Sequence, residues 1–176
     1  MNTIINIGRS FGSGGGYVGH AVAEKLGIPF YDSDSKIFAG KERKRSIFSV
    51  YDNYDDVLFQ AQSEAIRSVA LAGDAVFIGR CANYILRDQP CLNVFVTGSQ
   101  EYRIARLVQT EGLTPEEAEK LMKKKDHTRE QYYNYYTLGA WGQASDYHLC
   151  IDSSVLGIDG TADYIIEFGR KAGLIK

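Results

Sequence analysis

Residues 3–17 read TIINIGRSFGSGGGY, an isoleucine-rich segment followed at once by a cluster of glycines. The apolar segment predicts a short buried β-strand. Downstream of the glycines, Val18, Val22 and Leu26 recur at i, i+4 and i+8, which places them on one face of a helix. Gly27 follows directly and is a typical helix end. This part of the chain therefore predicts a strand, a glycine-rich turn and a helix.

The alternation of strand and helix continues to the end of the chain. Apolar runs predict four further strands, at residues 28–32, 74–79, 91–98 and 147–154. Periodicity predicts helices at 55–72, 81–87 and 159–172. Capping residues predict that two more helices begin, one at Ser99 and one at the capping box formed by Thr114 and Glu117. Residues 33–53 are predicted to form a loop or a weak helix. This order indicates an α/β fold whose parallel sheet has helices on both faces. Such folds bind ligands beyond the carboxyl ends of their strands.

The composition argues against several classes of protein. The chain has 176 residues, which suits one domain with at most a small inserted lid. Its 20 Lys+Arg and 22 Asp+Glu give a net charge of −2, so a strongly basic nucleic-acid binder is not expected. We see neither an apolar run of about 18 residues nor a signal-peptide pattern. Cys81, Cys91 and Cys150 fit neither a disulfide framework nor a zinc spacing, so we expect a cytoplasmic protein with no membrane partner and no metal-ligating cluster.

The glycine-rich turn is the first candidate for a binding site. The backbone N–H groups of such a turn, together with the positive end of the following helix, suit a phosphate group. Four glycines and a serine are more than a tight turn without a ligand requires. The residues that we expect to bind a nucleotide or phosphate are Gly12, Ser13, Gly14, Gly15, Gly16 and Tyr17. A dinucleotide-binding pattern through these glycines, with Asp32 as the ribose contact, fits less well.

The turn departs from the usual phosphate-binding pattern, G-x-x-x-x-G-K-[ST]. Gly15 stands where that pattern has its lysine, and Tyr17 lies close to where the magnesium-binding hydroxyl would follow. Neither residue can supply the group that the pattern has there. The charge of a bound phosphate must then be compensated from elsewhere, and Arg9, inside the turn, is the first candidate.

Six segments, taken in order, resemble the cytidylate kinase-like family. They are IGRSFGSGGG, AVAEKLGIPFYD, VFIGRCANYIL, VFVTGSQEYRIARL, YYNYYTLGAWG and YHLCIDSSVLG, and the resemblance as a whole covers residue 4 to about residue 168. The family consists of relatives of bacterial cytidylate kinase among the P-loop nucleoside monophosphate kinases. The resemblance implies a three-layer P-loop NTPase fold, with a five-stranded parallel sheet of order 2-3-1-4-5 and a helical lid. It implies one domain over residues 1–176, with an acceptor-binding region at about 32–73 and a lid at about 120–142.

The resemblance also implies residues for the acceptor. The segment at 31–33 is similar to the one that lies beside the monophosphate in this family, so Asp32 and Ser33 are candidates for acceptor binding; an Asp that caps a turn is the alternative. Arg80 resembles the arginine that grips the acceptor phosphate, and its place after a strand supports this independently. A surface ion pair is the alternative for Arg80. Cys81 stands where the family has an aspartate.

Cations for phosphoryl transfer are expected from the lid. Lys125 and Arg129, in a basic stretch of the chain, share one helix face at i, i+4. They resemble the lid cations that these kinases bring over the transferring group, and a solvated helix face is the alternative. Gly16 replaces an arginine of the family's glycine turn. The catalytic residues expected on these grounds are Arg9, Arg80, Lys125 and Arg129.

An aromatic stretch follows the lid cations. It contains Tyr132, Tyr133, Tyr135, Tyr136 and Trp141. We expect these rings to pack the lid helix onto the sheet or onto a partner chain, so a homodimer is one possibility. Stacking of a nucleotide base is the alternative.

Three hypotheses about function follow. The leading one is a kinase that transfers the γ-phosphoryl group of ATP to a nucleoside monophosphate (CMP or dCMP-like) or a similar small acceptor, with Mg²⁺ as a cofactor implied by the resemblance. The second is a catalytically weak or inactive regulatory protein that binds nucleotide or phosphate, which the replaced lysine and hydroxyl favour. Mg²⁺ dependence would separate them, because a kinase needs the metal. The third is a kinase for another small acceptor, which Cys81 and the short segment after Asp32 favour.

Overall fold

The computed structural model describes residues 2–38 and 56–176, and its centre is a parallel sheet. The strands are β1 (Ile4–Arg9), β2 (Phe30–Tyr31), β3 (Ala75–Ile78), β4 (Leu92–Thr97) and β5 (Leu149–Asp152). They lie in the order β2-β3-β1-β4-β5, which confirms the order that the resemblance implies. β1 is therefore the central strand, with β3 and β4 as its parallel partners.

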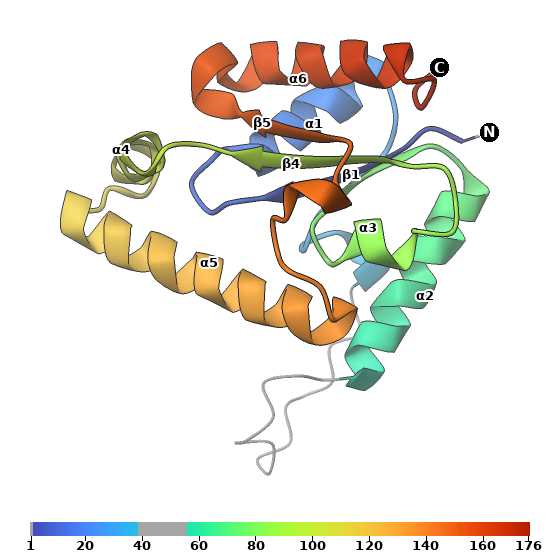
Figure 1. Ribbon diagram of the computed structural model, residues 1–176, viewed down its shortest axis with the longest axis horizontal. Helices are drawn as coiled ribbons and strands as arrows, with labels where there is room; N and C mark the ends of the chain where they lie inside the picture. The colour runs from blue at the N-terminus through green and yellow to red at the C-terminus, as the bar shows by residue number, and fades with distance from the viewer. Residues whose placement is uncertain (1, 39–55) are drawn as a thin grey trace.

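Helices cover both faces of the sheet, as the alternation of elements predicts. They are α1 (Gly15–Leu26), α2 (Asp56–Ala72), α3 (Ala82–Ile85), α4 (Gln100–Glu111), α5 (Pro115–Thr137) and α6 (Ser153–Lys171), with short 3-10 helices η1 (Lys36–Phe38) and η2 (Ala144–Asp146). Figure 1 shows α1 and α6 over one face of the sheet and α2, α3 and α5 over the other. The three layers are those of the predicted P-loop fold.

The two faces of β1 bury different groups, because successive side chains of a strand point to opposite faces. Ile5 and Ile7 belong to an aliphatic core with residues of α1 and α6. Ile4 belongs to a second core with residues of α2 and α3. Asn6 and Gly8 follow Ile4 at every second position. The face toward α3 and α5 therefore carries a polar side chain and a glycine, whereas the opposite face carries Ile5 and Ile7 before it reaches Arg9 at the end of the strand.

Several predicted element ends are confirmed. Gly27 ends α1 in the left-handed conformation, with φ 66°. The Ser99 side chain caps α4 by accepting a hydrogen bond from a backbone N–H. Thr114 and Glu117 form the complete capping box at the start of α5.

The last helix begins earlier than the predicted residue 159. The Asp152 side chain accepts a hydrogen bond from the N–H of Ser154 and so caps a helical turn that starts at Ser153. Gly157 then interrupts the helix with φ 70°. The apolar pattern identified only the part of α6 that lies beyond this interruption, and it extended the preceding strand by two residues.

The aromatic residues of the lid segment pack against the body of the protein. Tyr133 is part of the second core, and Tyr132, Tyr136 and Trp141 pack against it. The Tyr136 ring stacks on Phe59 of α2 with 3.9 Å between ring centroids. These contacts agree with the prediction that the rings pack the lid helix onto the sheet layer, and they fix the C-terminal half of α5.

The structure describes the predicted lid and only part of the predicted acceptor-binding region. The lid predicted at 120–142 falls on the later part of α5 and the turn after it. Residues 39–55, with a basic cluster at 41–45, lie outside the described residues, as does that part of the acceptor-binding region predicted at 32–73. Among the helices that the structure describes, none is long and apolar enough to cross a membrane.

Candidate active site

The glycine turn is shaped by two left-handed glycines and one buried serine. Gly12 and Gly14 have φ values of 80° and 79°, a backbone region that glycine enters at little cost. Ser13 is fully buried; its hydroxyl donates to the Ser10 carbonyl at 2.7 Å, and its own carbonyl accepts a hydrogen bond from the Ser153 hydroxyl at 2.6 Å. Hydrogen bonds from the side chains of Ser13 and Ser153 therefore hold the backbone of the turn in place.

The upper side of this turn is available to an anion. Within the described residues, the backbone N–H groups of Gly12, Gly14 and Gly16 have no protein acceptor. α1 begins at Gly15, so the positive end of its dipole points at the same place. Unpaired N–H groups at a helix N-terminus can bind an anion, and phosphate binding at the turn stays a prediction.

Arg9 occupies the space that a lysine at position 15 would need. A Cβ atom on Gly15 would overlap the Cβ of Arg9, and a Cβ atom on Gly79 would overlap its guanidinium. The Arg9 side chain therefore runs from the glycine turn across to the turn after β3. The glycine at position 15 and the position of the Arg9 side chain are thus linked, because a side chain at position 15 would clash with Arg9.

Two more arginines converge on Arg9. Arg129 of α5 donates from Nη1 to the Arg9 carbonyl at 3.0 Å, and its guanidinium lies over the Phe11 ring at 5.2 Å from the centroid. Arg80, in the turn after β3, donates from Nη2 to the Ser33 carbonyl at 3.4 Å and lies 5.0 Å over Phe38. Their side chains come from three different elements, as expected for a site at the carboxyl ends of parallel strands.

Carboxylates lie near two of these arginines, since Asp32 opposes the lowering of the Arg9 pKa and Asp126 opposes that of Arg129. Burial is the main cause that lowers the pKa of Arg9 to about 9, and the neighbouring cations Arg129 and Arg80 lower it further, against an opposing effect of Asp32. Burial also lowers the pKa of Arg129. None of the three forms a salt bridge with any described residue. Half-buried positive charge without a salt-bridge partner among the described residues favours the binding of an anion.

Two cavities meet at these arginines. The larger, of about 680 Å³, is lined by the glycine turn, α1 and the end of α4, and it includes Asp32 and Ser33. The smaller, of about 200 Å³, lies between β1, α3 and α5 and includes Arg80 and Cys81. Arg9 and Arg129 line both. The predicted site residues that the structure brings together are Arg9, Arg80, Arg129, Gly12, Gly14, Gly15, Gly16, Tyr17, Asp32 and Ser33.

Two predicted residues lie elsewhere. Ser13 lies beneath the turn, where its hydrogen bonds hold the backbone. Lys125 is exposed and lines neither of the two cavities. The helix face of α5 that touches the site carries Asp126 and Arg129 instead.

Asp32 accepts hydrogen bonds within its own turn and also lines the larger cavity. Its carboxylate accepts hydrogen bonds from the Asp34 N–H at 3.1 Å and from the Ser35 hydroxyl at 3.0 Å. The turn-capping alternative is therefore present in the structure. The residue also lines the larger cavity, so the two interpretations are compatible.

Asp126 is a site residue that sequence reasoning missed. One carboxylate oxygen accepts a hydrogen bond from the Phe11 N–H at 2.7 Å, and the other forms a salt bridge with Arg103 of α4. Arg103 also donates to the Phe11 carbonyl at 3.2 Å. This latch joins α4, α5 and the glycine turn. The spacing of Asp126 and Arg129, i and i+3 on one helix face, was the signal that could have indicated it.

Arg106 of α4 is a second residue on the rim of the larger cavity. Its guanidinium lies between the rings of Tyr17 and Tyr102, at 5.6 Å and 6.0 Å from their centroids. Its Nε is buried without a hydrogen-bond partner among the described residues. Tyr17 is itself 64% exposed, so it forms part of the wall and holds Arg106 in place.

The fold and the glycine turn define an α/β protein of the P-loop kinase type. The sequence model of the Cytidylate kinase-like family matches residues 4–155, and the chain therefore belongs to that family. A cytidylate kinase from Aeropyrum pernix is 25% identical over 168 residues, which are 93% of this chain and 96% of that protein.

Solved structures agree with this fold. An uncharacterized protein from Eubacterium ventriosum is 30% identical, with a TM-score of 0.82 over 97% of this chain and 99% of that one. A shikimate kinase from Bacteroides thetaiotaomicron has a TM-score of 0.60 at 16% identity, over 96% of this chain and 98% of that one. The second likeness is one of fold alone.

Proposed function

We propose that the protein transfers the γ-phosphoryl group of ATP to a nucleoside monophosphate of the CMP or dCMP type, or to a similar small acceptor. The observation that carries this proposal is the convergence of Arg9, Arg80 and Arg129 between two cavities, beside a glycine turn with unpaired N–H groups. Membership of the cytidylate kinase-like family supports a nucleotide kinase in general.

The donor phosphates belong on the glycine turn. The N–H groups of the turn and the N-terminus of α1 would hold the phosphate oxygens, and Arg9 would take the place of the usual lysine. Mg²⁺, when bound with the phosphates, neutralises charge on the transferring group. Mg²⁺ sites of this kind use one or two carboxylates plus substrate phosphates, and Asp32, on the wall of the same cavity, fits such a ligand.

The acceptor belongs on the other side of Arg9. Arg80 presents a planar guanidinium, which suits bidentate contact with a phosphate, and Ser33 and Asp32 adjoin it. Because an acceptor phosphate is already an anionic nucleophile, positioning and charge neutralisation account for the reaction without a dedicated base. Arg129 would neutralise the transferring group from α5. Lys125, on the exposed side of α5, joins it only if the helix moves toward the turn.

The experiment is calorimetry with ATP, with and without Mg²⁺, followed in the same sample by a transfer assay with CMP, dCMP, UMP and AMP. Transfer to one of them with a requirement for Mg²⁺ is expected. Binding of ATP without any transfer would favour the regulatory binder, or an acceptor outside this panel. No binding of ATP would overturn the proposal. The cytoplasmic location, the homodimer and the absence of nucleic-acid binding stay predictions.

A further inference from the structure

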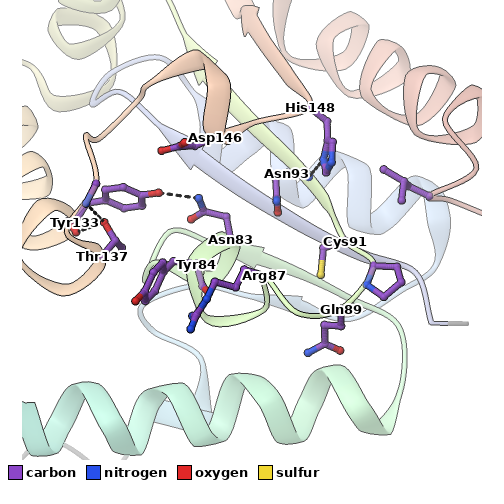
Figure 2. A pocket seen from close by; sticks show the side chains of 13 residues that line it. Asn83, Tyr84, Arg87, Gln89, Cys91, Asn93, Tyr133, Thr137, Asp146 and His148 are labelled. Atoms are coloured by element: carbon purple, nitrogen blue, oxygen red, sulfur yellow. Dashed lines mark hydrogen bonds between the residues drawn. The ribbon is translucent and has the colours of Figure 1, made fainter.

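A polar groove lies apart from the three arginines of the candidate active site. Its volume is about 500 Å³, within the roughly 300–1,000 Å³ of typical ligand pockets. Figure 2 shows Tyr84, Arg87 and Gln89 of the α3 segment on one side of it, and Asp146 and His148 of the segment before β5 on the other. Among the described residues that line the groove, none belongs to the glycine turn or to those arginines. A ligand of this groove would therefore be distinct from the substrates of the proposed function.

Arg87 presents a preorganised cation to the groove. Its Nη1 donates to the Tyr84 carbonyl at 2.9 Å, and its guanidinium lies over the Tyr84 ring at 4.3 Å from the centroid. Arg87 forms no salt bridge with a described residue. Two contacts with one neighbour thus hold the guanidinium in place. The N–H groups that these contacts leave unused suit a carboxylate, which arginine binds through two parallel hydrogen bonds.

Asp146 presents the opposite charge from the other side of the groove. It lies in η2, and among the described residues its carboxylate accepts only a long hydrogen bond, 3.4 Å, from the Ser145 hydroxyl. It too forms no salt bridge with a described residue. Its charge reaches the wall of the groove: burial is the main cause that raises the pKa of Tyr133, and Asp146 raises it further. The groove therefore carries a cation and an anion that do not pair with each other.

Two neutral side chains of the groove have fixed hydrogen-bonding roles. Asn83 donates from Nδ2 to the Tyr133 hydroxyl at 2.9 Å, which leaves its Oδ1 as an acceptor (Figure 2). His148 accepts the Asn93 N–H at Nδ1, at 3.0 Å, so the neutral ring carries its hydrogen on Nε2 and donates from there. The groove thus offers a neutral acceptor and a neutral donor in addition to the two charges.

We propose that this groove is a second binding site, for a small zwitterion of the dipeptide class. The C-terminal carboxylate would bind Arg87, and the N-terminal ammonium group would bind Asp146. The amide between these two groups has one donor and one acceptor, which match Asn83 Oδ1 and His148 Nε2. A ligand with a single charge would be attracted by one side of the groove and repelled by the other, so it fits less well.

The groove adjoins the smaller cavity of the candidate active site. Asn83 and Tyr133 line both spaces, so the hydrogen bond between them belongs to the common wall. A dipeptide bound to Asn83 would therefore contact a residue that also lines the cavity. The proposed site nevertheless does not depend on phosphoryl transfer, because neither Arg87 nor Asp146 lines that cavity.

The test is an NMR titration of the full chain, without nucleotide, with three ligands: alanylalanine, its N-acetyl derivative and its C-terminal amide. Alanylalanine should shift the backbone N–H signals of Asn93 and His148. Each derivative lacks one of the two charges and should bind about tenfold more weakly, which is the loss expected for one charge-assisted hydrogen bond.

Two variants assign the charges to their partners. Arg87→Gln should weaken the binding of alanylalanine about tenfold, but it should leave the affinity for the amide, which has no carboxylate, unchanged. Asp146→Asn should weaken alanylalanine to the same extent and leave the affinity for the N-acetyl derivative unchanged. Arg67→Gln, at an exposed position of α2 outside the groove, is the matched control and should change none of these affinities.

Equal affinities for the three ligands would overturn the proposal, as would variants that weaken all three equally. The absence of any shift with alanylalanine would overturn it as well. If the signals that shift belong instead to the glycine turn, the peptide binds at the candidate active site and the groove is not its site. Phosphoryl transfer can be present or absent in each of these cases, so this proposal and the proposed function fail separately.

Discussion

The two faces of β1 differ in what they contribute to the protein. On the α1 and α6 side, Ile5 and Ile7 fill an aliphatic core. On the α3 and α5 side, Asn6 and Gly8 line a cavity. The same six-residue strand therefore stabilises the fold with one face and shapes a binding site with the other. A polar residue or a glycine in the central strand of a sheet costs stability, so their presence indicates a requirement other than packing.

The largest expected effect is on the packed face. Ile7→Ala should lower the free energy of unfolding by about 3 kcal/mol, because it removes a fully buried side chain and leaves a cavity. Asn6→Ala, one position away on the other face, should cost only about 1 kcal/mol, the value of one hydrogen bond. Urea unfolding of both variants measures the difference. Equal losses in the free energy of unfolding would show that the two faces of β1 contribute equally to stability.

The next effect concerns the arginine that crosses between the cavities. Arg9→Gln should lower phosphoryl transfer by about a hundredfold, because a preorganised cation beside the transferring group is lost. Lys124→Gln, on the exposed side of α5, is the control and should change little. Transfer rates and ATP affinities of the two variants check this. Wild-type behaviour of Arg9→Gln would mean that another group replaces the missing lysine.

A smaller effect is expected from the latch between α5 and the glycine turn. Asp126→Ala should destabilise the protein by about 2 kcal/mol, since it leaves the Phe11 N–H without its acceptor and Arg103 without its salt-bridge partner. Glu130→Ala, on the solvent side of the same helix, should cost less than about 0.5 kcal/mol. Hydrogen exchange should report faster opening of α5 in the first variant only. Unchanged exchange would show that the aromatic contacts alone hold the helix.

The smallest effect is stabilisation by a simple anion. Pyrophosphate at about ten times its Kd should raise the free energy of unfolding by about 1.4 kcal/mol, because it neutralises arginines that form no salt bridge with a described residue. At the same pyrophosphate concentration, Arg9→Gln should gain less. Thermal unfolding at constant ionic strength measures both. An equal gain in the two proteins would place the anion away from Arg9.

The fold could be predicted further than the site. The apolar runs, Gly27 and the Thr114 capping box are local signals, and each specified an element or its end. The spacing of Asp126 and Arg129 could have indicated a shared helix face, but the contact of Asp126 with Phe11, 115 positions earlier in the chain, is not encoded by any local pattern. The place of Arg9 was indicated by the turn, but its need for Gly15 and Gly79 appears only when both turns are seen together.

The turn after β3 restricts how the acceptor site can change. Arg80 and Cys81 are consecutive residues other than glycine with φ 56°, a backbone region that Asn and Asp enter far more readily than β-branched residues. Most substitutions at position 81 would therefore strain the backbone and destabilise the protein, whatever their effect on ligand binding. Cys81→Asp is a change that the backbone tolerates, to the residue that the resemblance to the family implies at this position. Altered acceptor preference is thus most accessible to evolution, or to a directed library, through a very short list of residues at this turn.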